Sequence, residues 1–367
     1  MTGAGPVEVP AEVIDAYGWQ AAELAPLTGG LINTTFAVRI AGTPVAVVQR
    51  LHPVFGAAVN LDIDAVTTHL AARGLATPRL VRTTGGDAWV EHAGRVWRAL
   101  TWSDGITVHH VPGEDWAEAG GALVGRFHVA VADLEHTYAF ARAGVHDTAA
   151  HLGRLRALVA AAEGPGASRE GLRADRDEAE AIALGREILD ATLTLPALPA
   201  TPFRHCHGDL KISNVLFTVL PSPLRSNPRP VRGHCLVDLD TVGLGTMAFE
   251  LGDAMRSWCN PHGEDAGSVA FELPIFAAAI RGFLGVAGGL VRRDERIAIV
   301  LGLETVCLEL AARFAVDVFQ DEYFGWDPAR FPTRRAHNEV RARGQLALGL
   351  AVRARRQDAL DLVLATT

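Results

Sequence analysis

The residues best suited to chemistry lie in two short polar clusters. The first is the segment HCHGDLKISNVLF at positions 205–217, and the second is CLVDLD at positions 235–240. Each cluster is flanked by short apolar runs with the character of β-strands, so we expect its polar side chains on turns at strand ends. Such turns present carboxylate and amide oxygens to a ligand, because loops held by a rigid scaffold carry most binding groups.

Carboxylates and an amide at this spacing are typical of phosphoryl transfer. That reaction needs a carboxylate that orients the attacking hydroxyl and accepts its proton, and oxygen ligands for the Mg²⁺ that neutralises a triphosphate. In this interpretation Asp209 is the base, and Asn214, five residues later, is a metal ligand. Asp238 is the second metal ligand, and His207 braces the loop without reacting. Asp240 fits two roles equally well, as a further neighbour of the metal or as a carboxylate that stabilises the turn.

Both clusters resemble the catalytic and metal-binding segments of the aminoglycoside-phosphotransferase-like kinases. HGDLKISNVLF and LVDLDTVGLGTMAFELGDAMR have that pattern, and KISNVLF, DLDT and GDAMR are closest to the N-acetylhexosamine 1-kinases. The resemblance implies a protein-kinase-like bilobal α+β fold, with a small β-rich N-terminal lobe and a larger, mainly helical C-terminal lobe. It also implies that Asp253 anchors the catalytic loop from a helix.

The same resemblance extends to a nucleotide loop near the N-terminus, LTGGLINTTF at positions 27–36. Gly29 and Gly30 would let backbone amides approach the phosphates of ATP. Asn33 and Thr34 would be polar residues of the same loop.

The strand expected at residues 45–51 departs from the usual pattern of these kinases. Most relatives carry there a lysine that pairs the α- and β-phosphates, whereas this chain has Gln49 and Arg50, a pair similar to that of the hexosamine kinases. We expect Arg50 to supply the phosphate cation, and a solvent-facing arginine on a strand edge is the alternative. The following helix lacks the usual glutamate and offers Asp62 and Asp64 nearby, so a lysine–glutamate ion pair is not expected.

Residues near the C-terminus suit a sugar acceptor. ARFAVD at 312–317, EYF at 322–324 and HNEVRARGQL at 337–346 recur in similar form in the hexosamine kinases. An arginine can bond hydroxyls or an N-acetyl carbonyl, and aromatic rings stack on the apolar face of a sugar. We interpret Arg341 and Arg343 as surface or structural pairs. The candidates for acceptor binding are Arg313, Tyr323, Phe324 and Trp326.

The resemblance implies transfer of the γ-phosphoryl group of ATP, with Mg²⁺, to the anomeric hydroxyl of a hexose or N-acetylhexosamine. Two alternatives stay open. An amino-alcohol acceptor such as an aminoglycoside, choline or homoserine needs an acidic pocket, for which Asp317, Asp321 and Glu322 are available. The absent lysine also leaves open a nucleotide-binding pseudokinase that acts as a regulator, although the intact set of predicted base and metal ligands argues against it.

Short strands followed by helices must position these residues. Apolar runs between Gly-containing turns predict an antiparallel sheet, with strands at residues 36–40, 45–51, 88–91 and 96–102. Helical spacing predicts helices at residues 63–73, 116–134, 149–161 and 175–193, and Pro- and Gly-containing loops at 163–171 and 220–233. We therefore expect a nucleotide-binding lobe over residues 1–103, whose backbone near 99–101 meets the adenine, and a catalytic and acceptor-binding lobe over residues 104–367.

Composition limits the other function classes. The 367-residue chain is 49% hydrophobic and 21% charged, which is typical of a globular protein. Its net charge of −8, with both signs mixed along the chain, gives no electrostatic support for a nucleic-acid partner. We expect a cytoplasmic protein without a membrane partner, because signal-peptide features and an apolar run of about 20 residues are absent. The four separated cysteines predict buried, reduced thiols, and the oligomeric state stays open.

Overall fold

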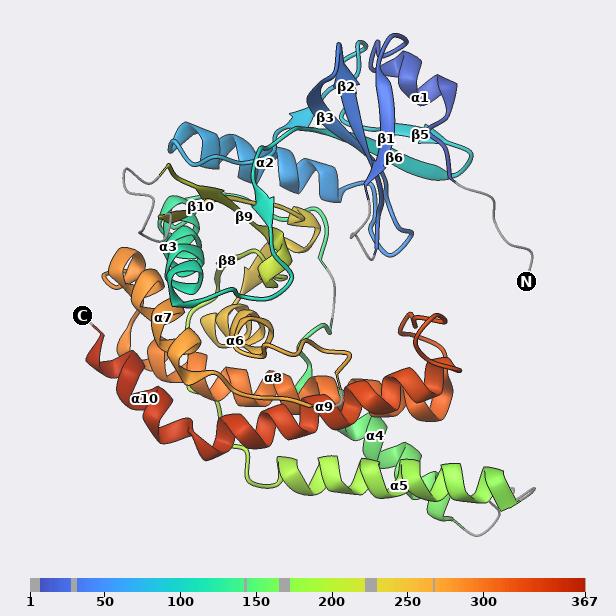
Figure 1. Ribbon diagram of the computed structural model, residues 1–367, viewed down its shortest axis with the longest axis vertical. Helices are drawn as coiled ribbons and strands as arrows, with labels where there is room; N and C mark the ends of the chain where they lie inside the picture. The colour runs from blue at the N-terminus through green and yellow to red at the C-terminus, as the bar shows by residue number, and fades with distance from the viewer. Residues whose placement is uncertain are drawn as a thin grey trace.

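The chain folds into a small β-rich lobe and a larger helical lobe (Figure 1). The computed structural model describes residues 7–27, 32–141, 144–164, 172–221, 230–266 and 268–366. In Figure 1 the blue sheet and its helices lie at one end of the molecule, and the green to red helices form the other end. Within the described ranges, no helix is long and apolar enough to cross a membrane.

The small lobe is an antiparallel sheet with strand order β1-β2-β3-β6-β4, and β5 also pairs with β6. Its elements are α1 (Ala11–Ala16), β1 (Glu23–Leu27), β2 (Thr34–Ile40), β3 (Thr43–Arg50), α2 (Val59–Ala72), β4 (Leu80–Val81), β5 (Val90–His92) and β6 (Arg95–Thr101). The four predicted strands are confirmed as β2, β3, β5 and β6, whereas the sequence did not predict β1 and β4.

Tight turns set the register of this sheet. Ala41 and Gly42 join β2 to β3 with φ angles of 49° and 79°, and Ala93 and Gly94 join β5 to β6 with φ angles of 48° and 69°. Two consecutive positive φ angles match the right-handed twist of paired strands. Glycine at the second position adopts this conformation without steric cost, so the predicted Gly-containing turns become two-residue hairpins.

The two faces of the sheet pack against different layers. On one face, Val48 packs in a small core with residues of α1. On the other face, Val47 joins the main core, to which α2 contributes. Because successive side chains of a strand point to opposite faces, Gln49 lies on the α2 face and Arg50 on the α1 face.

The larger lobe combines long helices with small antiparallel sheets, one in the order β10-β9-β7 and one that pairs β11 with β8. Its strands are β7 (Ile106–Thr107), β8 (Arg204–Cys206), β9 (Val215–Val219), β10 (Val231–Leu236) and β11 (Gly243–Gly245). Its helices are α3 (Glu114–Ala130), α4 (Thr148–Glu163), α5 (Leu172–Thr192), α6 (Met247–Trp258), α7 (Leu273–Ala287), α8 (Arg293–Gln320), α9 (Arg334–Ala354) and α10 (Arg356–Ala365), with short 3₁₀ turns η1 (Ile212–Asn214) and η2 (Leu239–Thr241).

Helix α6 packs against α8 with the two backbones in direct contact. A β-carbon at Gly302 of α8 would lie 2.0 Å from the carbonyl oxygen of Ala248 in α6. A β-carbon at Gly252 of α6 would lie 2.8 Å from the carbonyl carbon of Gly302. Only glycine permits this approach, so the crossing fixes α6 rigidly against the longest helix of the lobe.

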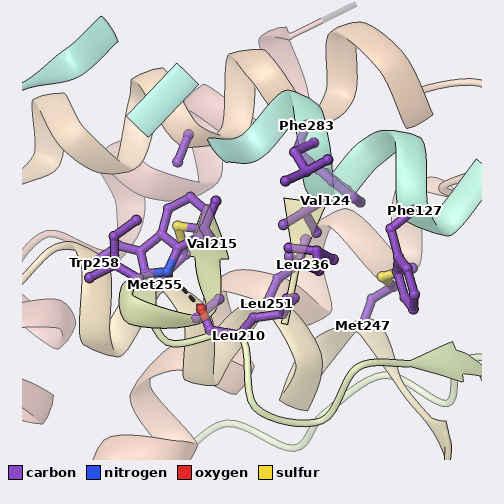
Figure 2. Close-up of a cluster of buried hydrophobic side chains, with 14 of the residues drawn as sticks. Val124, Phe127, Leu210, Val215, Leu236, Met247, Leu251, Met255, Trp258 and Phe283 are labelled. Carbon is purple, nitrogen blue, oxygen red and sulfur yellow. Dashed lines mark hydrogen bonds between the residues drawn. The ribbon is translucent and has the colours of Figure 1, made fainter. Parts of the chain in front are cut away.

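The buried core extends from α6 to the loop between β8 and β9. The indole Nε1 of Trp258, in α6, donates a 2.7 Å hydrogen bond to the carbonyl of Leu210 (Figure 2). Leu210 and Val215 are buried with Leu251 and Met255 of the same helix. A buried indole with its donor satisfied holds its partner firmly, so the core of the larger lobe fixes the first polar cluster.

Some boundaries differ from the sequence prediction. Strand β10 begins at Val231, inside the loop predicted at 220–233, and residues 222–229 lie outside the described residues. Helix α2 begins at Val59, four residues before the predicted start, and α3 ends at Ala130 rather than at 134. The thiols are free and buried as predicted at Cys206, Cys235, Cys259 and Cys307.

Candidate active site

The loop between β8 and η1 lies directly on the second polar cluster. Gly208 has a φ of 79°, and a β-carbon there would lie 2.5 Å from the carbonyl oxygen of Thr241. The Thr241 hydroxyl donates a 2.8 Å hydrogen bond to the carbonyl of His207. A glycine is therefore required at 208 for the two segments to meet.

The predicted base and the first metal ligand are in contact. The side-chain amide nitrogen of Asn214 donates to the Asp209 backbone carbonyl at 2.8 Å and to its carboxylate Oδ2 at 3.2 Å. Because Nδ2 is used on Asp209, the Oδ1 of Asn214 is the atom suited to ligate a cation. The structure therefore brings these two predicted site residues together.

Lys211 connects the base to the second metal ligand, and the sequence interpretation missed it. Its Nζ lies 2.6 Å from Oδ2 of Asp209 and 3.8 Å from Oδ2 of Asp238. Burial alone would lower the pKa of Lys211, but the carboxylates of Asp209 and Asp238 outweigh it and raise that pKa, so the ammonium stays charged. The signal was present in the sequence as a lysine two residues after the base.

Asp238 has the backbone and the electrostatics of a cation ligand. It follows β10 in the left-handed region, with φ 65° and ψ 57°, which is uncommon for a residue other than glycine. Burial, and then the neighbouring carboxylate of Asp240, raise the pKa of Asp238. A divalent cation would relieve this excess of negative charge, and carboxylate and amide oxygens are donors that Mg²⁺ accepts. Asp238 and Asn214 therefore carry donor atoms of the kind that could hold a divalent cation.

A buried glutamate anchors the catalytic loop. Glu250, in α6, accepts hydrogen bonds from the amide nitrogens of His207 at 2.8 Å and Gly208 at 2.9 Å. His128 lies 3.2 Å from the same carboxylate. Burial opposes ionisation of Glu250, but the hydrogen bond and charge of His128 outweigh it and lower the pKa of this carboxyl. The anchoring role expected for Asp253 thus belongs to Glu250, since the Asp253 carboxylate pairs with Arg256 at 2.8 Å.

The predicted brace, His207, holds the loop through both ring nitrogens. Its Nδ1 accepts from the amide of Asp209 at 3.3 Å, so the Nε2 carries the proton that bonds the carbonyl of Val237 at 3.0 Å. The imidazole is fully buried. It therefore connects the catalytic loop to the end of β10, a geometry suited to bracing rather than to reaction.

Asp240 is bound from the small lobe. Its Oδ1 forms an ion pair with Arg98 of β6, and both side chains are 1% exposed. Its Oδ2 accepts from the side-chain amide of Asn33 at 2.5 Å. Of the two roles considered for Asp240, neither anticipated this contact between the lobes. The sequence interpretation missed Arg98, although an arginine inside the otherwise apolar run at residues 96–100 was a usable signal.

The other predicted nucleotide residues are placed as follows. Arg50 lies on the α1 face of the sheet and donates to the hydroxyl of Thr34 at 3.4 Å. Gln49, on the opposite face, accepts from Arg98. Gly29 and Gly30 lie outside the described residues.

Asp62 and Asp64 have other partners. Asp62 accepts from the backbone amides of Ala139 at 2.8 Å and Phe140 at 2.9 Å, and Asp64 pairs with Arg82. Asp62 therefore connects α2 to the segment that follows α3.

Two neighbouring cavities lie near these groups. The Arg313 cavity, of about 660 Å³, is lined by three of the four acceptor candidates, Arg313, Tyr323 and Phe324. The Asp253 cavity, of about 480 Å³, is lined by Asp253 and also reaches Gly208, beside the base. The cavities share the residues Phe140, Ala141 and Val145. The fourth candidate, Trp326, is not a lining residue of either cavity.

The aromatic loop of the Arg313 cavity is held by one carboxylate. Asp317 accepts from the backbone amides of Glu322, Tyr323 and Phe324 at 2.9, 2.7 and 2.9 Å. Its Oδ2 also accepts from the side chain of Asn338 at 2.7 Å. Asp317 is 2% exposed. The negative charge of Asp317 is therefore compensated by these four donors, which stabilise the conformation of the loop.

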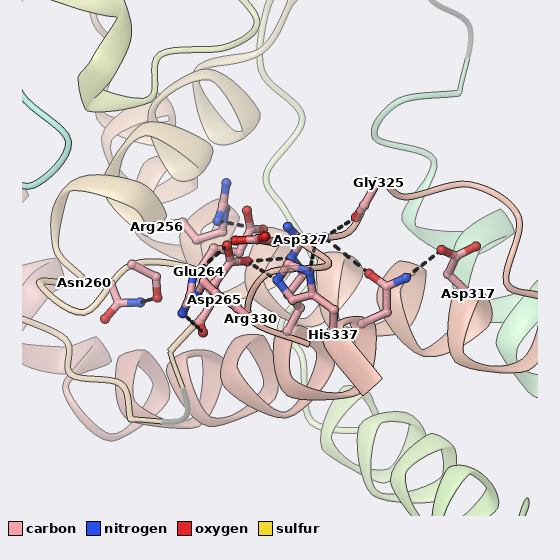
Figure 3. Close-up of polar contacts among 12 residues, drawn as sticks. Arg256, Asn260, Glu264, Asp265, Asp317, Gly325, Asp327, Arg330 and His337 are labelled. Carbon is pink, nitrogen blue, oxygen red and sulfur yellow. Dashed lines mark hydrogen bonds and ion pairs between the residues drawn. The ribbon is translucent and has the colours of Figure 1, made fainter. Parts of the chain in front are cut away.

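Helix α9 fixes the other side of this loop (Figure 3). Asp265 lies 2.9 Å from Nε2 of His337 and 2.6 Å from Nε of Arg341. Arg341 also donates to the carbonyl of Gly325 at 2.8 Å. Arg341 thus has the structural pairing that the sequence predicts, and Arg343 forms an i,i+4 pair with Glu339.

Comparison with known proteins gives a family match. A sequence model described as the phosphotransferase enzyme family matches residues 23–280. The matched range runs from β1 into α7 and contains both polar clusters.

Solved structures have the same architecture. An aminoglycoside phosphotransferase from Alicyclobacillus acidocaldarius is 16% identical, with a TM-score of 0.56 over 97% of this chain and 98% of that chain. A choline/ethanolamine kinase family protein from Mesorhizobium loti is 13% identical, with a TM-score of 0.55 over 96% and 97%. Amicoumacin kinase hAmiN, in complex with AMP-PNP, Ca²⁺ and Ami, is 13% identical, with a TM-score of 0.56 over 88% and 87%. The predicted kinase-like bilobal fold is confirmed, and at these identities the likeness concerns the fold alone.

Replacing Glu250 with Gln tests the anchor of the catalytic loop. The glutamine side chain keeps the shape of Glu250 but removes its charge, and its amino group faces a backbone N–H that needs an acceptor. We therefore expect the free energy of unfolding at pH 7 to fall by about 3 kcal/mol. Because the fold lowers the pKa of Glu250, its stabilisation is present above the unfolded value of about 4.3 and is lost as the pH falls through the folded value. Urea unfolding from pH 7 down to about 3.5 should therefore show the wild-type and variant stabilities converging.

The matched control for this test is Glu339→Gln, which removes the more exposed i,i+4 pair with Arg343. We expect that change to stay within about 0.5 kcal/mol of wild type. Equal stability of Glu250→Gln and wild type at pH 7 would contradict the anchoring role.

Proposed function

Because this chain belongs to the phosphotransferase enzyme family, we propose that it transfers the γ-phosphoryl group of ATP, with Mg²⁺, to a hydroxyl of a small-molecule acceptor. The observation that carries the proposal is a series of contacts in which Asn214 bonds Asp209, Asp209 pairs with Lys211, and Lys211 pairs with Asp238. The complex of hAmiN with AMP-PNP and Ca²⁺ supports a nucleotide and a divalent ion as joint ligands of this fold.

In the proposed reaction, each residue has one task. Asp209 orients the acceptor hydroxyl and takes its proton as the oxygen attacks, a contribution of about 10²–10⁴-fold in rate. Asn214 and Asp238 would hold Mg²⁺, which neutralises the triphosphate. Lys211 stays charged and balances the carboxylates on both sides of the transfer. Positioning and electrostatic stabilisation, rather than a covalent intermediate, then lower the barrier.

The proposal divides the reaction between the lobes. We assign nucleotide binding to residues 1–103, with the adenine against the backbone near 99–101, and catalysis and acceptor binding to residues 104–367. The end of β6 at Thr101 and the pairing of β7 with β9 of the larger lobe support a boundary between them.

We further propose that the acceptor is a hexose or N-acetylhexosamine, phosphorylated at its anomeric hydroxyl. The resemblance of KISNVLF, DLDT, GDAMR and the C-terminal segments supports this acceptor. The Arg313 cavity falls within the usual volume range of small-ligand sites. The Arg313 guanidinium lies 5.7 Å from the centre of the Phe324 ring, which gives a polar donor beside an aromatic face.

The charges around the cavity favour a neutral acceptor over an amino alcohol. The carboxylate of Asp317 is used by three backbone amides and Asn338. Asp253, in the neighbouring cavity, is paired with Arg256. Arg154 and Arg313 line the Arg313 cavity and would repel an ammonium group. Of its two acidic lining residues, Asp317 is already hydrogen-bonded by backbone amides and Asn338, so only Glu322 is left to attract a cation.

An acceptor panel tests the reaction and its position. With ATP and Mg²⁺, the wild-type protein should convert N-acetylhexosamines to products that lose their reducing end and show an anomeric proton coupled to phosphorus by NMR. Asp209→Asn should bind ATP normally and lose about 10²–10⁴-fold in turnover, because it cannot accept the proton. Products that keep their reducing power, or phosphorylation of amino alcohols alone, would contradict the 1-kinase proposal and leave a phosphotransferase with another acceptor.

Removing the guanidinium of Arg313 tests the acceptor cavity. Arg313→Ala should raise the KM for the sugar about tenfold or more, the cost of a lost hydrogen bond from a charged group, and leave the KM for ATP nearly unchanged. Arg343→Ala is the control, because Arg343 forms a helix-surface pair with Glu339 and should change neither constant. Small and equal effects of Arg313→Ala on both substrates would remove Arg313 from the acceptor site.

A further inference from the structure

One buried arginine lies where the two lobes meet. The side chain of Arg98 is 1% exposed, although its guanidinium group carries a full positive charge. A buried charge is tolerated only where other groups compensate it. The partners of Arg98 therefore identify what holds this charge at the junction of the lobes.

The small lobe directs the guanidinium. Gln49, directly opposite on β3, accepts from Nε at 2.9 Å and from Nη2 at 2.8 Å. Asn60 of α2 accepts from Nη1 at 3.4 Å. The amide of Gln49 is itself oriented by a 3.1 Å bond to the hydroxyl of Thr35. The residues of β3 and α2 together therefore orient the guanidinium group so that Nη1 faces the larger lobe.

The larger lobe provides the counter-charge. Nη1 of Arg98 forms its ion pair with Oδ1 of Asp240, in η2. Asp240 is two residues from Asp238, and the next residue, Thr241, bonds the carbonyl of His207 in the catalytic loop. The ion pair therefore acts on the segment that carries the proposed metal ligand.

A third segment joins the same carboxylate. Oδ2 of Asp240 accepts from Asn33, and Oδ1 of Asn33 accepts from the backbone amide of His52 at 2.9 Å. Asn33 lies at the end of the predicted nucleotide loop, just before β2. Asp240 is thus bound both by the sheet and by the segment expected to cover the phosphates.

We propose that Arg98 is a positioning residue for the metal-bound triphosphate: through its buried pair with Asp240 it fixes the metal-binding segment beneath the small lobe. This inference rests on the proposed function. It also gives a role to Gln49, which occupies the inward position of β3 and turns its carbonyl to Arg98. Arg50, on the opposite face of the sheet, does not contact this network.

The pair also sets the charge around Asp238. Arg98 occupies Oδ1 of Asp240 and offsets part of its charge, so Asp238 and Asn214 are the neighbouring oxygen donors left for a cation. Without Arg98, a buried carboxylate would lose its charged partner two residues from the metal ligand and would move to reach other donors. The geometry of Asp238 would change with it.

The experiment measures binding of AMP-PNP with Mg²⁺ to the full chain by calorimetry, and separately kcat and both KM values. Arg98→Met and Asp240→Asn should each weaken binding of the magnesium complex by about tenfold or more, the effect typical of groups that orient a metal ligand. The KM for the acceptor should change little. The double variant should be no weaker than the single variants, because both remove one pair. Arg98→Lys should recover much of the affinity, since it keeps the charge.

The matched control is Arg353→Met. Arg353 pairs at 2.7 Å with Glu304, which is fully buried in α8, far along the chain from the proposed site. That variant should lower the melting temperature and leave the affinity for the magnesium complex unchanged. If Arg98→Met does not fold, Asp240→Asn gives the same readout with one oxygen replaced by an isosteric amide.

Two results would overturn the inference. One is wild-type affinity of Arg98→Met or Asp240→Asn for the magnesium complex with a lowered melting temperature, as in the control. The other is additive losses in the double variant. Failure of the wild-type protein itself to bind AMP-PNP with Mg²⁺ would instead contradict the proposed function, so the two failures are distinguishable.

Discussion

The structure depends on the gathering of three aspartates, Asp209, Asp238 and Asp240, where the lobes meet. Like charges this close destabilise one another unless cations compensate them. Lys211 lies 2.6 Å from Asp209, and Arg98 pairs with Asp240. Asp238 lies 3.8 Å from Lys211, and burial together with Asp240 raises its pKa. A divalent cation is therefore favoured at Asp238, and the other two charges are held in place around it.

The core of the larger lobe fixes the positions of these charged side chains relative to one another. The backbones of α6 and α8 are in contact at Gly252 and Gly302, and this contact fixes the position of α6 relative to α8. From α6, Glu250 bonds two amides of the catalytic loop and Trp258 bonds the carbonyl of Leu210. These bonds restrict the motion of the loop, so the carboxylate of Asp209, the proposed base, would need little reorganisation before the proposed reaction.

Local spacing made part of this site predictable. Asp209 and Asn214 are five residues apart, and a short loop leaves few ways to separate them. Glu250 and Asp253 are three residues apart and share a helix face, so spacing could not decide which one bonds the loop. Likewise, the burial of Arg98 beneath the small lobe depends on which face of the sheet it occupies, and its partner, Asp240, is 142 residues away. The bilobal fold was predictable, whereas contacts between distant segments required the packed structure.

The most direct test of a metal-dependent phosphotransferase site is thermal unfolding of Asp238→Ala with ATP, in the presence of Mg²⁺ or of a chelator. Binding to the folded state raises the melting temperature, so the wild-type protein should be stabilised more by ATP with Mg²⁺ than by ATP alone. Asp238→Ala should lose that metal-dependent increment and keep its fold, with the exposed Asp358→Ala of α10 as a control that retains the increment. Equal stabilisation of wild type and Asp238→Ala, with and without metal, would contradict the account.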